Sequence, residues 1–240
     1  MRRSLKAFLV AAAIATALAA VPAAGASGGT ATLNVVHGIP GAQVDVCAKG
    51  PATNGVWGKI LSFPQFQYGV AAPVAGLAPG AYDAKVVAAG ADCAIAQPVS
   101  PELALNGAAL GAGQNVSVVA ALAPGGGVGL VVGANDTSKA GFGKGRLTAY
   151  HAAPVGAVDV RGGLVLWLPT LFGNVTYGQS AARVVPGLAY TVAVTNAGKG
   201  PFSIVAGPTR LAVPAGQNTV VYVVGAGKDT RVVVQRIPLA

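Results

Sequence analysis

Short runs rich in valine, each bounded by glycine, proline or asparagine, follow one another along most of the chain. The first half contains TATLNVVHG, AQVDVCA, AYDAKVVAAG and NVSVVAAL, and the second half contains RLTAYHA, AVDVRG, LAYTVAVTNA and NTVVYVVGA. Pro-Gly pairs in LAPG and VVPG stand between such runs, where a type II turn needs a glycine. The run Ser100–Leu110 is expected to be an extended strand. Short strands with turn signals about every 8–12 residues predict an all-β protein built as an antiparallel β-sandwich.

The pattern occurs twice. At a constant spacing of 114 residues, the residues His37, Pro40, Val44, Asp45 and Val46 recur as His151, Pro154, Val158, Asp159 and Val160. A Tyr-Gly pair at residues 68–69 recurs at 177–178, and AGQN at 112–115 recurs at 215–218. Because these landmarks keep their order while the spacing shrinks through loop deletions, they indicate two homologous units of about 100 residues.

A polar, glycine-rich stretch, GANDTSKAGFGKG, separates the two units. It predicts a first β-sandwich domain at residues 27–133, a linker at 134–145 and a second β-sandwich domain at 146–240. A linker of this length limits the relative motion of the domains without abolishing it.

The beginning of the chain has the layout of a secretory signal peptide. A basic MRRSLK precedes an apolar run of 15 residues, and the small residues Ala24, Gly25 and Ala26 follow it. This predicts a leader at residues 1–26 that is cleaved after Ala26. A membrane anchor is the alternative, but it needs about 20 apolar residues. We expect no membrane span in the mature chain.

Charge does not indicate nucleic-acid binding. The whole chain has a net charge of +9, and without the three basic residues of the leader 13 basic and 7 acidic side chains remain. The basic residues are dispersed, whereas a nucleic-acid surface gathers them on one face with aromatic residues between them. No nucleic-acid partner is expected, and weak attraction to acidic envelope polymers stays open.

The two cysteines, Cys47 and Cys93, both fall in the first unit. In an exported protein an even count predicts one disulfide. A metal site or a reactive thiol pair is the alternative, but neither C-x-x-C spacing nor nearby histidines support it.

Each unit resembles the secreted bacterial domain known as domain of unknown function 4397. The first copy carries the motifs VVHGIPGAQVDV, FQYGV, LAPGAYDAKV and LGAGQNVSVV, and the second carries AYHAAPVGAVDV, VTYGQ, VVPGLAYTVAV and VPAGQNTVVYV. The resemblance implies secretion from a bacterium and tandem immunoglobulin-like sandwiches, and it implies no established activity. The family commonly has an aspartate directly after the first proline, where this chain has Gly41 and Val155. Any His–Asp pair of metal or proton-relay type at that position is therefore missing.

The repeated histidines and aspartates, His37 with Asp45 and His151 with Asp159, are the candidates for chemistry. A serine hydrolase also needs a serine on a strained turn, a glycosidase needs two carboxylates, and zinc needs three or four ligands; one His and one Asp per unit satisfy none of these. Calcium at Asp92, Asn135 or Asp136 stays open, although no calcium-loop motif is present. We expect no catalytic, cofactor-binding or metal residue. The histidine is expected to tie the turn that Pro40 or Pro154 begins to the sheet, while the aspartate points outward or caps a neighbouring turn.

Aromatic residues gather in corresponding stretches of the two units. Trp57, Phe63, Phe66 and Tyr68 lie in the first, and Trp167, Phe172 and Tyr177 lie in the second. Such clusters can stack on sugar rings, but in a small sandwich they are more often core.

The sequence therefore predicts a secreted, non-enzymatic binding or interaction module at the cell envelope or outside the cell. Its partner would be an unknown protein or an envelope polysaccharide, and no cofactor is expected. A structural spacer of the surface or matrix is the first alternative. An envelope enzyme with an unrecognised site near His37 or His151 is the second.

Overall fold

The computed structural model describes residues 29–62, 64–164 and 168–240. The expected signal peptide at residues 1–26 lies outside the described residues, as do Phe63 and Trp167 of the aromatic clusters. The regular secondary structure of the described part consists almost entirely of strands, as predicted, and these form four sheets in two sandwich-like units.

In the first unit two four-stranded sheets pack face to face. The first inner sheet has the order β4 (Ala71–Leu77), β1 (Ala31–Gly38), β7 (Asn115–Leu122) and β8 (Val128–Ala134). The first outer sheet has the order β3 (Gly58–Leu61), β2 (Val44–Lys49), β5 (Gly80–Ala88) and β6 (Ala104–Leu110). Two 3-10 turns, η1 (Pro51–Thr53) and η2 (Pro101–Leu103), lie between strands, so the segment expected as one strand at 100–110 begins with a helical turn.

The second unit repeats this plan strand for strand. The second inner sheet has the order β12 (Ser180–Pro186), β9 (Lys144–Ala152), β15 (Gln217–Val224) and β16 (Arg231–Pro238). The second outer sheet has the order β11 (Thr170–Val175), β10 (Val158–Gly163), β13 (Ala189–Asn196) and β14 (Ile204–Ala212). One 3-10 turn, η3 (Gly227–Asp229), precedes β16.

Antiparallel pairing, expected throughout, has one exception in each inner sheet. β1 pairs in parallel with β7, and β9 pairs in parallel with β15, while the other pairs of described strands are antiparallel. The reason is topological. The chain reaches β7 from the outer sheet through the turn at residues 111–114 and enters the inner sheet in the same direction as β1. A parallel pair always requires such a crossover, which a pattern of short strands does not reveal.

Alternation of side chains along the strands gives each unit its own core. Val35, Val46 and Val86 meet between the sheets of the first unit, and Leu147, Val160 and Val194 meet between those of the second. A tyrosine closes each core at corresponding places: the Tyr82 hydroxyl donates to the carbonyl of Ala78, and the Tyr190 hydroxyl donates to that of Pro186.

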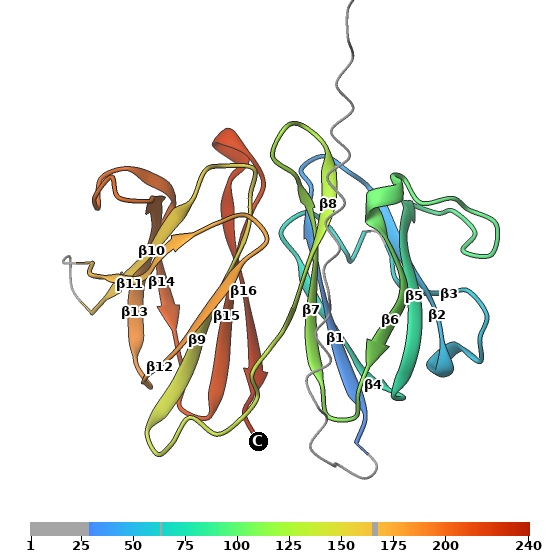
Figure 1. Ribbon diagram of the computed structural model, residues 1–240, viewed down its shortest axis with the longest axis horizontal. Helices are drawn as coiled ribbons and strands as arrows, with labels where there is room; N and C mark the ends of the chain where they lie inside the picture. Colours follow the sequence, from blue (N-terminus) through green and yellow to red (C-terminus); the bar gives the residue numbers. More distant parts are fainter. Residues whose placement is uncertain (1–28, 63, 165–167) are drawn as a thin grey trace, which may run out of the picture.

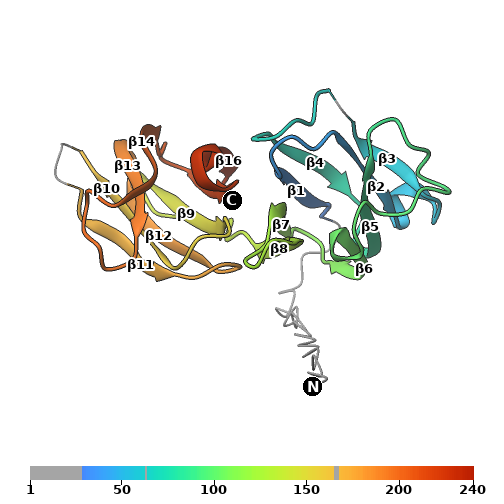
Figure 2. The ribbon, with the colours of Figure 1, turned by 90° about the horizontal axis from the view of Figure 1, so that it is seen from above.

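The two inner sheets also pack against each other, so the sandwiches lie side by side (Figures 1 and 2). This contact is a third buried core, which includes Val36 and Val131 of the first unit with Tyr150 and Tyr222 of the second. Gly133 is required there, because a Cβ atom on it would lie 2.5 Å from the Tyr150 ring. The units are therefore joined by a packed interface as well as by the linker.

Candidate functional site

Each repeated histidine lies buried at the end of the first strand of its unit and closes the turn that follows. The Nδ1 atom of His37 accepts from the Ile39 amide at 3.3 Å, and Nε2 lies 3.1 Å from the carbonyl of Ala42. His151 does the same with the Ala153 amide at 3.5 Å and the carbonyl of Gly156 at 3.0 Å. One ring nitrogen accepts while the other donates, which is the bonding pattern of a neutral imidazole.

Burial keeps these imidazoles neutral. Loss of hydration lowers the pKa of both His37 and His151 below the ordinary value of 6.5, and the bonds to backbone carbonyls offset this only in part. Proton exchange with a substrate would require an accessible ring, and both rings are fully enclosed.

The histidines also hold the Tyr-Gly landmark of each repeat. The amide of Gly69 donates to the carbonyl of His37 at 2.8 Å, and the amide of Gly178 donates to that of His151 at 2.9 Å. Both glycines have a φ near +85°, a conformation that favours glycine. The landmarks that recur in the sequence thus meet in space as one strand-turn assembly.

The repeated aspartates are buried on the outer side of the outer sheets and cap turns. Asp45 Oδ2 accepts from the Gly90 amide at 2.9 Å and pairs with Lys59 Nζ at 2.6 Å. The side chain faces away from the core and caps a turn, and Lys59 and the turn cover it.

The second copy preserves this cap with a different cation. Asp159 accepts from the amides of Asn174 at 2.9 Å and Gly198 at 3.1 Å, and it lies 3.4 Å from Arg161 Nη2. In both copies, the turn amides that donate to the aspartate belong to other segments than the backbone groups bonded by the histidine. The pair therefore works as two separate structural clamps.

The predicted disulfide is present. Cys47 and Cys93 are joined with their Cα atoms 5.7 Å apart, and the described residues contain no free cysteine. The bond fastens the loop after β5, residues 89–100, over the outer side of the first outer sheet. The second unit has Arg161 where the first has Cys47, so the fastened loop distinguishes the first copy.

Trp57 lies against this disulfide. Its ring packs on the cluster of Cys47, Val87 and Cys93, and Lys85 Nζ lies 4.1 Å from the ring centroid. Lys85 Nζ also donates to the carbonyl of Ala96 at 2.7 Å, which fixes the loop above the ring. Trp57 is thus not part of the sandwich core, which is the role considered more frequent for such aromatic residues.

The surface around Trp57 is apolar with a basic border. Ile95 is 79% exposed and Val56 is 65% exposed, and both are next in sequence to residues packed in the Trp57 cluster. Lys49 Nζ lies 5.6 Å from the Trp57 centroid and 3.2 Å from Asp83 Oδ2. We call Lys49, Val56, Trp57 and Ile95 the disulfide-loop surface.

A buried polar network crosses the interface between the units. The Tyr222 hydroxyl lies 2.7 Å from Ser117 Oγ and donates to Gln235 Oε1 at 3.0 Å. Gln235 in turn donates to the side chain of Asn34. Burial raises the pKa of Tyr222 well above its ordinary value. The network fixes the units relative to each other, since unpaired polar groups would be costly there.

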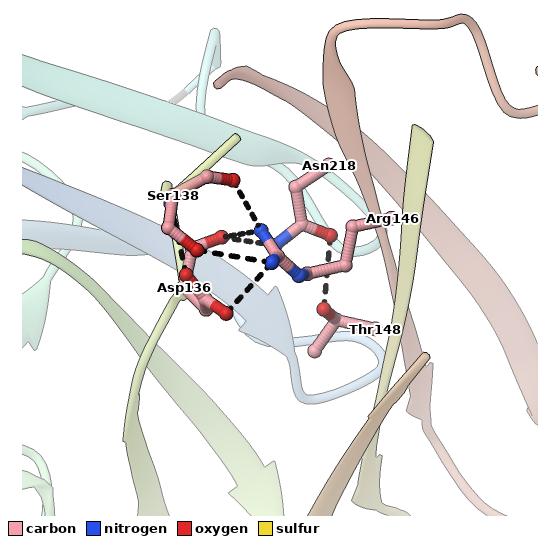
Figure 3. A network of polar contacts seen from close by, with 5 residues as sticks. All are labelled: Asp136, Ser138, Arg146, Thr148 and Asn218. Atoms are coloured by element: carbon pink, nitrogen blue, oxygen red, sulfur yellow. Dashed lines mark hydrogen bonds and ion pairs between the residues drawn. The ribbon is translucent and has the colours of Figure 1, made fainter. Parts of the chain in front are cut away.

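The linker is fastened as well, around Arg146 (Figure 3). The Arg146 guanidinium donates to the carbonyls of Asp136 at 2.9 Å and Ser138 at 2.8 Å, and it pairs with Asp136 Oδ2 at 2.8 Å. Burial of Asp136, which would raise its pKa, is outweighed by hydrogen bonds from Ser138 and by the charge of Arg146, so its pKa is lowered. The Arg146 guanidinium therefore has a structural role, because it binds the linker to the second unit.

The duplication did not reveal the interface network. Asn34, Ser117 and Gln235 stand in valine-rich strands, where polar residues are normally on the solvent face. The sequence indicated the interface only in that the residues at the same positions of the other repeat, Thr148, Val220 and Gly133, differ from them in size or polarity. Such differences between copies are expected when the two faces pack against each other.

The described residues contain no group of three or more His, Cys, Asp or Glu side chains that could hold a metal ion. Within the same residues, no helix has the length and apolar character needed to cross a membrane.

Comparison with known proteins identifies one family. A family model described as Domain of unknown function (DUF4397) matches residues 31–161, from the start of β1 into β10. No curated protein matches the chain.

Two solved structures are distantly similar to this chain. The Bacillus anthracis TIE protein is 11% identical with a TM-score of 0.27, over 82% of this chain and 34% of that one. A leucine-rich repeat protein from Bacteroides thetaiotaomicron VPI-5482 is 15% identical with a TM-score of 0.20, over 88% of this chain and 27% of that one. The chain spans about a third of the first protein and about a quarter of the second.

Proposed function

The chain belongs to the DUF4397 family, a family without a defined function, and from the geometry of its first unit we propose that it is a secreted, non-enzymatic binding module of the bacterial cell envelope. Its binding site is the disulfide-loop surface. Its ligand is an envelope polysaccharide that carries negative charge.

One contrast carries this proposal. The repeated histidines and aspartates are buried in bonds that hold turns, whereas Ile95 and Val99 are exposed on a loop that a disulfide fastens. Ile95 on that loop is 79% exposed, and Val56, next to Trp57 in sequence, is 65% exposed. Loops positioned by a rigid scaffold are the usual place for binding residues.

The chemistry of the surface favours sugars with acidic groups. An indole ring can stack on the apolar face of a sugar ring. The ammonium group of Lys49 borders the ring and attracts carboxylate or phosphate groups, whereas the ammonium group of Lys85 is buried and bonded to the carbonyl of Ala96. The Lys49–Asp83 pair is partly exposed, with 39% and 28% of the side chains accessible, so its loss to a ligand would cost little.

The side-by-side arrangement supports a module over a spacer. A spacer gains reach when its domains follow each other end to end, but these sandwiches share a buried face. Packing through this face makes the molecule shorter and more rigid than an end-to-end arrangement would. A rigid molecule can hold one binding surface in a fixed orientation.

An array of purified acidic envelope polysaccharides tests the proposal. The full chain should bind at least one polymer saturably, and Ile95→Asp should weaken that binding at least tenfold. Phe202→Asp is the matched control, because Phe202 is 94% exposed on a turn of the second unit. Absence of binding by the unaltered chain, or equal binding by Ile95→Asp, would contradict the proposal.

The enzyme alternative has a separate test. His37→Gln and His151→Gln together remove both imidazoles. If the chain turns over any envelope substrate, and the double variant folds normally but loses that turnover, the enzyme reading stands. Reduced thermal stability with polysaccharide binding retained supports the binding module.

A further inference from the structure

Seven of the eight edge strands in the described sheets carry a feature that hinders pairing with another chain. Charged residues, prolines, bulges and left-handed residues serve this purpose in natural sheets. In this chain the features that hinder pairing are Lys59 in β3, Pro73 in β4, Gly107 with φ +64° in β6, Asn174 with φ +55° in β11, Arg183 in β12, Pro208 in β14, and Arg231 with Arg236 in β16.

β8 is the exception. Its sequence, VGLVVGA, has no charged residue and no proline, and none of its residues has a positive φ. Its register with β7 is regular over its whole length, from Val128 opposite Leu122 to Ala134 opposite Val116. Figure 2 shows β8 at the end of the first inner sheet, following β4, β1 and β7.

Along β8, residues that bond to β7 alternate with residues that do not, and this alternation shows which backbone groups face outward. The Asn135 amide donates to the carbonyl of Asn115 at 2.7 Å, and these two residues continue the β7–β8 register. Because bonded residues alternate in an antiparallel pair, Gly129, Val131 and Gly133 bond to β7. The amides and carbonyls of Val128, Leu130, Val132 and Ala134 therefore point away from the sheet.

Within the described part of the chain, no backbone hydrogen bond joins β8 to a segment other than β7. The carbonyl of Ala134 accepts from the Tyr150 hydroxyl at 3.2 Å. The helical turn η2 lies next to β8 and places Leu103 in the core, without a backbone bond to the strand. Leu130 and Val132 thus present both of their backbone groups to a further strand.

The side chains of the same two residues border apolar gaps in the first sandwich. Leu130 lines a cavity of about 20 Å³ with Leu33 and Leu105, and Val132 lines a second of about 30 Å³ with Leu105 and Ala109. Both residues remain partly exposed. A strand added beside β8 would place every second side chain over these gaps.

We propose that β8 pairs with β8 of a second copy of the chain, in an antiparallel ladder centred on Val131. In this register Val128 lies opposite the partner's Ala134, and Leu130 lies opposite the partner's Val132. All outward backbone groups then meet their counterparts, and the two inner sheets continue into one sheet. The contact is isologous, so it closes after two copies.

A second copy fits this edge because the edge is neutral. A strand with charged residues would have to place them beside the apolar gaps, at a desolvation cost. β8 itself is neutral, rich in β-branched valine and of equal length, so it meets the requirement without like-charge repulsion. The dimer does not depend on whether the disulfide-loop surface binds a polysaccharide, since that surface lies on the other sheet of the unit.

Sedimentation of the purified full chain over a concentration series tests the dimer. One pair of short strands buries less area than a standard interface, so we expect half-dimerisation in the range of about 10–200 μM. The amides of Leu130 and Val132 should exchange with solvent rapidly at low concentration and become protected at high concentration. A chain that is monomeric up to the top of this range would overturn the proposal.

A proline provides the matched pair of variants. Val132→Pro removes an amide that faces outward and leaves the β7 ladder intact, so it should fold normally and weaken dimerisation at least tenfold. Val234→Pro on β16 is its control, because Val234 occupies the corresponding position of the second unit. The Leu239 amide donates to the carbonyl of Gly216, and bonded residues alternate along β16, so the backbone groups of Val234 also face away from β15. Val234→Pro should dimerise like the unaltered chain. Equal dimerisation by Val132→Pro, with its melting temperature unchanged, would place the contact on another surface and overturn the proposal. If Val132→Pro fails to fold, Val132→Lys with Val234→Lys replaces the pair and is judged by the same outcomes.

Discussion

Tyr150 and Tyr222 stack with their ring centroids 5.4 Å apart, and their hydroxyl groups reach the linker and the first unit, respectively. The Tyr150 hydroxyl donates to Asn135 Oδ1 at 3.1 Å, and the Tyr222 hydroxyl lies 2.7 Å from Ser117 Oγ. By the repeat spacing, the first unit has Val36 and Val119 at the corresponding positions. The interface therefore joins two homologous faces that have become complementary in size, with large rings on one side and small residues on the other.

Removal of the Tyr222 hydroxyl should weaken this interface. Tyr222→Phe keeps the stacked ring but leaves the oxygen of Gln235 without its donor in a buried site. We expect a loss of about 1–3 kcal/mol in the free energy of unfolding, measured by urea denaturation. In a double-mutant cycle with Ser117→Ala, the two costs should sum to more than the cost of the double variant. Strictly additive costs would show that the two hydroxyls are not coupled.

Gly133→Ala should destabilise the same interface by overpacking. The added Cβ atom would lie 2.5 Å from the Tyr150 ring, so the units must shift apart or the ring must rotate. We expect a cost of about 1–3 kcal/mol and a lower melting temperature. Gly127→Ala is the control, because no atom lies within 4 Å of its added Cβ and its φ is not positive. Equal melting temperatures for the two variants would mean that the interface is loosely packed.

The sequence was informative wherever a local rule applied. Valine-rich alternation predicted the strands, and the two cysteines predicted the Cys47–Cys93 bond. The parallel pairs β1–β7 and β9–β15 could not be predicted, because the path between sheets leaves no periodic signal. The interface was also missed. Asn34 and Ser117 become buried only when the second unit covers the first inner sheet, and neither residue indicates this cover by itself.

The candidate surface illustrates the same limit. The aromatic residues of the first unit were weighed together, but Phe66 is buried within the sandwich while Trp57 lies outside it on the disulfide. Side-chain type alone could not separate these roles, since the loop that packs beside Trp57 is placed by a covalent bond from a distant strand.

Loss of the disulfide should destabilise the first unit and release its loop. The bond joins residues 46 positions apart, for which the chain-entropy model gives about 4 kcal/mol. We expect Cys47→Ala with Cys93→Ala to lower the free energy of unfolding by up to about this amount, and the released loop at residues 89–100 to be cleaved faster by proteases. A reducing agent should produce the same change in the unaltered chain and none in the double variant. An effect of the reductant on the double variant would contradict this assignment.

Acidification should destabilise the fold through the two repeated histidines. Burial lowers the pKa of His37 and His151 in the folded chain below 6.5, so the unfolded chain binds more protons once the pH falls below that value. Their contribution to stability is complete above pH 6.5 and is lost as the pH falls toward the folded pKa. We expect the melting temperature to decrease between about pH 7.5 and pH 5 in the unaltered chain. His37→Gln with His151→Gln should be less stable at pH 7.5 but show a flatter decrease. An equally steep decrease in the double variant would show that the two histidines are not the source of the acid sensitivity in this pH range.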